Sequence, residues 1–199
     1  MTRTAVDVSR LPGFAFHHRN LVWWGTAGLI AIEGSAFALM IVTYLYLKGR
    51  TPHWPPGHFP PEIFWGTVNT VVLLLSGAPN HLAKRAAERL DLRKVWLWMG
   101  VSLVFAAAFN IIRIFEFQSL NVWWDDNAYG SVVWMLLGLH TTHILTDFGD
   151  TVVLAVLMFV GPVEEKRFTD VSENTGYWYF VVLSWLPIYG VIYWAPRLI

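Results

Sequence analysis

The 199-residue sequence contains no cysteine. This absence excludes disulfide bonds, iron–sulfur clusters, thiolate zinc sites and catalysis by a thiol. Charged residues are scarce, at 14% of the chain, whereas they make up about a quarter of a typical soluble domain. Positive and negative charges balance, so no net field favours binding to nucleic acid or to any other polyanion. What remains is 55% hydrophobic and 16% aromatic, a composition typical of a membrane domain.

Five apolar stretches are each close to the length of about 20 residues that crosses a bilayer as a helix. They cover residues 21–47, 63–82, 95–117, 131–160 and 176–195. We therefore predict an all-α integral membrane protein, a five-helix transmembrane bundle. Residues 21–199 are expected to form a single membrane domain, preceded by a cytoplasmic N-terminal tail of residues 1–20. The second stretch is the weakest of the five, because Asn69 and Pro79 interrupt it.

The lysine and arginine residues between these stretches predict how the chain is oriented. Basic residues concentrate in the cytoplasmic segments of membrane proteins. With the N-terminus in the cytoplasm, the cytoplasmic segments carry Arg3, Arg10, Arg19, Lys84, Arg85, Arg89, Arg93, Lys94, Lys166 and Arg167. The outer segments carry only Lys48, Arg50 and Arg197. The sequence therefore predicts a cytoplasmic N-terminus and a C-terminus on the outer side.

Several ionisable residues lie inside the predicted spans. A charge at the bilayer centre costs at least about 2.5–3.5 kcal/mol, so such residues usually face the bundle interior and have a partner. Glu33 lies midway along the first span. Arg113 and Glu116 lie three residues apart near the outer end of the third span, and this spacing predicts that they pair along one face of the helix.

The fourth span, with the sequence GLHTTHILTDFGD, has a polar face. At about 100° per residue, four side chains fall within roughly 80° of arc: His140, His143, Asp147 and Asp150. Such a set could hold a metal ion, a haem or a di-iron centre. Bundle metal sites draw ligands from two or more helices, however, and the other histidines lie in loops or at the ends of spans. A metal site is therefore disfavoured, and two interpretations stay open: polar groups that satisfy each other between helices, or a role in protonic coupling or headgroup contact.

Four further segments occur in a fixed order along the chain. They are AIEGSAFALMIVTYLYL around Glu33, PPEIFWGTVNTVVLLLSG from Pro60 to Gly77, FEFQSLNVWWDDNAYGSVVWMLLGLHTTH from Phe115 to His143, and YGVIYW from Tyr189 to Trp194. From Trp24 to Trp194 the chain resembles subunit III of the haem–copper cytochrome c oxidases. Each motif alone is weak, and their common order over most of the chain makes the resemblance specific.

The chain departs from the pattern of that family at three points. The full-length family has seven helices, and this chain would lack the first two, as shorter bacterial forms do. The histidine and aspartate usual near the start of the final family helix fall on Tyr179 and Val182, so their roles do not carry over. Asp147 and Asp150 have no counterpart in the family pattern.

The resemblance implies a non-catalytic subunit of a haem–copper terminal oxidase in the bacterial inner membrane. Haem and copper would lie in the partner subunits I and II, and this chain would have no cofactor and no catalytic residue of its own. It would bind phospholipid, stabilise subunit I and support proton uptake. His140 or His143 would face Glu33 in a buried hydrogen-bonding seam. The alternatives are an accessory subunit of a nitric oxide reductase and an autonomous intramembrane metal-dependent redox enzyme.

Overall fold

The computed structural model describes residues 16–57, 59–160 and 164–198. Most of the predicted N-terminal tail, residues 1–15, lies outside the described residues. The long helices are α1 (Leu21–Arg50), α2 (Ile63–Glu88), α3 (Leu92–Gln118), α4 (Ala128–Val160) and α5 (Glu165–Tyr189). A short 3-10 turn (His17–Arg19) precedes α1, and a π-helical turn η2 (Gly190–Trp194) joins α5 to α6 (Ala195–Leu198). The prediction of an all-helical fold is confirmed for the described residues.

Capping side chains define where two of the helices begin. The Asn20 side chain accepts a hydrogen bond from the backbone N–H of Val22 and caps α1. Asp91 caps α3 in the same way, by accepting from the N–H of Lys94. Hydrogen bonds from the Lys94 side chain and backbone lower the pKa of Asp91, which lies in the turn between α2 and α3. Leu90, with a φ of 56°, makes that turn tight.

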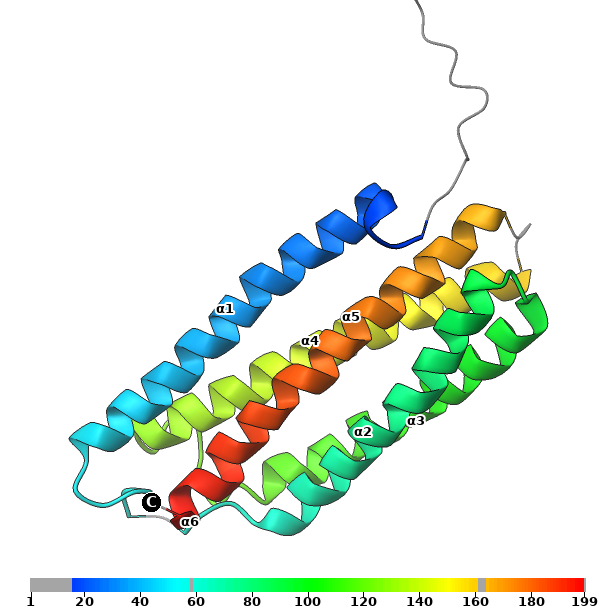
Figure 1. Cartoon of the computed structure of the whole chain (residues 1–199). Helices are drawn as coiled ribbons and strands as arrows, with labels where there is room; N and C mark the ends of the chain where they lie inside the picture. The colour runs from blue at the N-terminus through cyan, green and yellow to red at the C-terminus, as the bar shows by residue number, and fades with distance from the viewer. Residues whose placement is uncertain (1–15, 58, 161–163, 199) are drawn as a thin grey trace, which may run out of the picture.

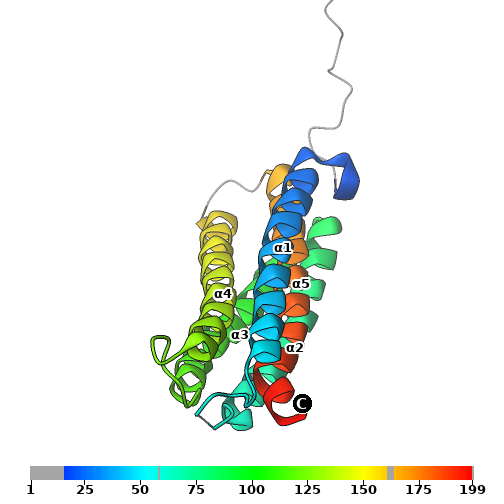
Figure 2. The same cartoon turned by 90° about the vertical axis from the view of Figure 1, so that its left-hand side faces the viewer.

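Helix α5 is the centre of the bundle. It packs against α1, α2 and α4, while α3 packs against α2 and α4. Figure 1 shows α1 along one edge of the molecule and α2 with α3 along the other, with α5 between them; in Figure 2, α1 lies in front of α5, with α4 to one side. The fifth helix begins at Glu165 instead of residue 176, where the prediction placed it. Its first turns are polar, but Thr169, Ser172 and Thr175 are buried, so packing extends the helix beyond its apolar part.

Within the described part of the chain, four helices are long and apolar enough to cross a membrane: α1, α3, α4 and the continuous segment from Glu165 to Leu198. Large apolar side chains such as Ile32 and Val104, each 70% exposed, cover their outer faces. This is the pattern of a multi-pass membrane protein, in which lipid covers the outer apolar surface. Helix α2 is not among the four helices that meet this criterion, although the sequence predicted a span at residues 63–82.

The lower hydropathy of α2 comes from its polar side chains, and these side chains point into the bundle. Thr70 and Ser76 are buried, and their hydroxyl groups accept hydrogen bonds from the indole N–H groups of Trp185 and Trp178 at 2.8 and 3.0 Å. A buried tryptophan needs such an acceptor. The interface between α2 and α5 therefore combines large aromatic rings with paired polar groups.

The π-helical turn η2 sets the position of Tyr193. The ring of this residue lies directly against the backbone of α2 at Gly66, where an added Cβ would collide with ring carbons of Tyr193. Only glycine allows this approach. The consequence is that the fully buried Tyr193 reaches past α2 toward the interior of the bundle.

Gly66→Ala is therefore expected to destabilise the protein by about 1–3 kcal/mol, the usual cost of overpacking a close-packed interior. Gly77→Ala is the matched control in the same helix, because an added Cβ there meets nothing within 4 Å. Thermal unfolding in detergent, followed by circular dichroism, measures both variants. Equal melting temperatures for the two would contradict the requirement for glycine at position 66.

Candidate functional site

A buried group of charged and polar side chains joins α2, α3 and η2. The Arg113 guanidinium forms an ion pair with Glu116 through Nη1 and Oε2, 3.0 Å apart. Asn69 donates to Glu116 Oε2 at 2.8 Å, and the Tyr193 hydroxyl donates to Oε1 at 2.6 Å. All four residues are at most 1% exposed. We call Arg113, Glu116, Asn69, Tyr193 and His140 the arginine cluster.

His140 belongs to this cluster and contacts α5 as well. Its Nδ1 lies 3.3 Å from Nη2 of Arg113, and its Nε2 lies 3.0 Å from the carbonyl oxygen of Val181. Arginine only donates and a carbonyl only accepts, so Nδ1 is the acceptor and Nε2 carries the proton. Phe109 and Trp185 place their rings 4.6 and 4.3 Å from the guanidinium carbon of Arg113. Both nitrogens of His140 are therefore engaged, and its tautomer is fixed by its neighbours.

A second polar group, the glutamate site, consists of Glu33, His143 and Tyr177 from α1, α4 and α5. His143 Nε2 lies 3.4 Å from Glu33 Oε1, and the Tyr177 hydroxyl donates to Glu33 Oε2 at 2.8 Å. His143 Nδ1 lies 2.6 Å from the carbonyl oxygen of Leu139. The Phe37 ring covers the imidazole, with ring centroids 5.0 Å apart.

This geometry fixes which ring nitrogen of His143 faces Glu33. The Leu139 carbonyl accepts from Nδ1, so that nitrogen is protonated. Nε2 is then the nitrogen that faces Glu33, 3.4 Å from Oε1. The Glu33 side chain is 19% exposed and borders the cleft between α1, α4 and α5.

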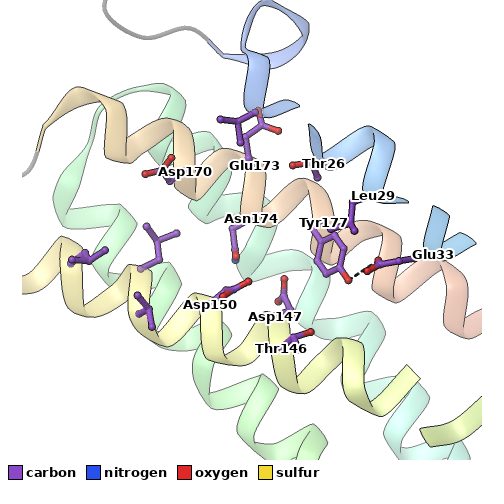
Figure 3. A pocket seen from close by; sticks show the side chains of 14 residues that line it. Thr26, Leu29, Glu33, Thr146, Asp147, Asp150, Asp170, Glu173, Asn174 and Tyr177 are labelled. Carbon is purple, nitrogen blue, oxygen red and sulfur yellow. Dashed lines mark hydrogen bonds between the residues drawn. The ribbon is translucent and has the colours of Figure 1, made fainter. Parts of the chain in front are cut away.

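A cleft of about 570 Å³ opens beside the glutamate site, between α1, α4 and α5. Figure 3 shows Asp147 and Asp150 of α4 facing Tyr177 and Asn174 of α5 across it. Asp147 is only 3% exposed, whereas Asp150 lies on the open side of the cleft. The cleft and the glutamate site thus form one continuous polar region.

The predicted stripe on α4 is divided between three surroundings. His143 is the histidine that faces Glu33, while His140 faces Arg113. Asp147 and Asp150 reach neither histidine within hydrogen-bonding distance and line the cleft instead. Asp150 is exposed, so the buried part of the stripe ends at Asp147. The four side chains share one face of α4. Because this helix has different neighbours along its length, the four side chains have different surroundings.

The contacts of two tyrosines in these sites could not be predicted from the sequence. Tyr177 is 144 residues from Glu33, and Tyr193 is 77 residues from Glu116. Each lies in an apolar segment of α5 or η2, where a tyrosine looks like any other aromatic residue. The one available signal was that a buried hydroxyl group needs a hydrogen-bond partner.

Comparison with known proteins identifies the family of this chain. Residues 53–196 match the family model described as Cytochrome c oxidase subunit III. The chain belongs to this family. A relative named cytochrome c oxidase subunit 3 from Thermostichus vulcanus is 24% identical, with 92% of each chain covered. Relatives of the same name from Cyanidium caldarium and Synechocystis sp. are 30% and 25% identical; the alignments cover 94% and 92% of this chain and 74% and 80% of theirs.

The residues of this subunit III chain do not suit a haem or a metal ion. Both ring nitrogens of His140 and of His143 already have protein partners. A ligating imidazole needs one nitrogen free for the metal. Within residues 16–57, 59–160 and 164–198, no three His, Asp or Glu side chains are arranged to hold a metal ion.

The stability of the subunit III chain is expected to depend on keeping both charges of the arginine cluster paired. Glu116→Gln leaves the buried Arg113 charge without its counter-charge and should lower the free energy of unfolding by about 3–5 kcal/mol. Glu62→Gln, at an exposed carboxylate before α2, is the matched control and should have little effect. The double variant Arg113→Met/Glu116→Gln should recover part of the loss, because no buried charge is left. Thermal unfolding in detergent decides, and a double variant less stable than Glu116→Gln would contradict this account.

Proposed function

We propose that this subunit III chain is a non-catalytic subunit of a haem–copper terminal oxidase, with haem and copper in the partner subunits I and II. Its membership of the family supports a place in an oxidase complex. The observation that carries the non-catalytic role is the full engagement of both intramembrane histidines. A redox centre needs ligands, and these side chains have no free nitrogen to offer.

The glutamate site gives this subunit a protonic role. Glu33 faces His143, and Tyr177 keeps the Glu33 carboxyl group in place. Asp147 and Asp150 continue the polar surface along the cleft toward the N-terminal end of α1. We infer that the glutamate site, together with Asp147 and Asp150, takes up protons from the cytoplasmic side and supports their delivery to subunit I. The arginine cluster is the rigid part that keeps α2–α5 together for docking on that subunit.

Phospholipid is the second partner that we propose. Helix α1 is the least buried of the four candidate membrane spans, and Ile32 and Leu39 on it are 70% and 67% exposed. Such a surface is stable only in hydrocarbon or against another apolar helix. Bound phospholipid on this face would seal the glutamate site from bulk water and hold α1 against α4 and α5.

We also propose that all five long helices cross the bacterial inner membrane, with residues 21–199 as one domain and a cytoplasmic N-terminal tail of residues 1–20. Helix α2 packs along α3 and α5, and its polar groups are directed inward. It therefore needs no aqueous surface despite its lower hydropathy. The basic residues around the α2–α3 turn support a cytoplasmic position for that turn.

Cysteine labelling tests this orientation in a background that has no natural cysteine. Leu90, 41% exposed, lies in the α2–α3 turn, and Asp125 is exposed in the α3–α4 connection. A membrane-impermeant maleimide should label Leu90→Cys only from the cytoplasm and Asp125→Cys only from outside. The reverse pattern, or labelling of both from one side, would refute the five-span topology.

Removal of the chain from its oxidase tests the function itself. The haem spectrum and the first turnovers should be unchanged, because the redox centres keep their ligands on other subunits. Activity should then decay faster with time and fall more at high pH, where protons are scarce. Glu33→Gln in the intact complex should give a milder form of the same defect, and Glu62→Gln should behave as wild type. Loss of the first turnover with haem still bound would show that this chain carries the chemistry.

A further inference from the structure

The cleft between α1, α4 and α5 has a chemical character that proton supply does not explain. Five carboxylates line it: Glu33, Asp147, Asp150, Asp170 and Glu173. No lysine, arginine or histidine is among its lining residues. Glu33 is paired with His143 and Tyr177, and Asp170 lies 3.5 Å from Arg167. The remaining carboxylates are Glu173 and the neighbouring pair Asp147 and Asp150.

Asp147 is the decisive residue. Its side chain is 3% exposed and points into the cleft from α4, as Figure 3 shows. Throughout the part of the chain that the structure describes, it accepts no hydrogen bond and pairs with no cation. Asp150, three residues further on the same face, has no such partner there either and adds a like charge. A buried carboxyl group without a partner either takes up a proton or needs a cation beside it.

The other walls of the cleft are apolar. Val22 and Leu29 of α1 face Val153 and Leu157 of α4 across it. Asn174 of α5 is held in place by donating to Thr151 at 2.8 Å, which leaves its amide oxygen as a further acceptor at the cleft. The cleft therefore has a negative, hydrogen-bond-accepting end and a hydrophobic body. Its volume of about 570 Å³ is in the range of sites for small molecules.

We propose that this cleft binds a hydrophobic organic cation, an ammonium group on an apolar body, with the ammonium between Asp147 and Asp150. The ammonium donates to these carboxylates and to the amide oxygen of Asn174, and the apolar body lies between α1 and α4. Anionic ligands are repelled by the same carboxylates. The ligand enters from the membrane, because α1 and α4 are lipid-facing helices. This site shares Asp147 and Asp150 with the proposed proton path, but binding of a cation by the isolated chain does not depend on the role in the oxidase.

The test uses the full chain purified in dodecyl maltoside. A photoreactive alkylammonium carrying a diazirine on its chain is cross-linked, and the labelled peptides are identified by mass spectrometry. Label should appear on residues 146–157 and 170–177. Dodecylammonium should compete with it, whereas dodecanol and dodecanoate, with the same chain length, should not.

Charge-neutral variants give the second readout. Asp147→Asn should weaken the competition by dodecylammonium roughly tenfold, the effect expected for the loss of one close charge partner. Asp125→Asn, which removes the same charge from an exposed connection, is the matched control and should leave it unchanged. The Asp147→Asn variant should fold normally, because it removes an unpaired buried carboxylate, and circular dichroism verifies its fold. The Asp150→Asn variant repeats the test at an exposed residue that has no packing role.

Three outcomes would overturn the proposal. Equal competition by dodecanol would mean that only the hydrophobic wall binds. Unchanged affinity in both Asp→Asn variants would mean that these carboxylates keep their own protons and attract no cation. A co-purified phospholipid that protects the cleft peptides and is not displaced by dodecylammonium would assign the cleft to lipid instead.

Discussion

The burial of Arg113 is the constraint on which the rest of the bundle depends. A guanidinium in the interior of a membrane protein must be neutralised, bonded and shielded from lipid at once. Glu116 supplies the charge from the same helix, and His140 accepts from α4. Neutralisation is not enough, because Glu116 also needs Asn69 from α2 and Tyr193 from η2. One charge therefore fixes the relative positions of four segments.

The same requirement accounts for several irregular features. Gly66 has no side chain, so Tyr193 can pass close to α2. The π-helical turn after α5 changes the direction in which Tyr193 points. Polar residues lower the hydropathy of α2, and they are present because the tryptophans of α5 need hydrogen-bond acceptors there. Features that weaken individual helices thus strengthen the contacts between them.

The helices could be predicted from the sequence because their signals are local. Apolar length marks the spans, and the three-residue spacing of Arg113 and Glu116 is visible in one turn. Which histidine faces Glu33 depends on how α4 is rotated against α1, and no local pattern records that angle. The start of α5 was misplaced for a related reason, since its polar first turns are buried by neighbours distant in sequence. Tyr177 and Tyr193 were missed because their partners lie far away along the chain.

A further contact joins α2 and α5 beside the buried tryptophans. The hydroxyl of Tyr179 on α5 lies 2.7 Å from Nδ1 of His81 on α2. Lys84 lies over the tyrosine ring, with its Nζ 5.9 Å from the centroid.

The peripheral place of α1 has a consequence for biosynthesis. This helix leaves the ribosome before α4 and α5, against which it packs. The hydrogen bond from Tyr177 to Glu33 closes a loop of 144 residues. During translation Glu33 therefore has no tyrosine partner until α5 has been made, and contacts so distant in sequence are slow to form. The glutamate site cannot be completed before α5 has been synthesised.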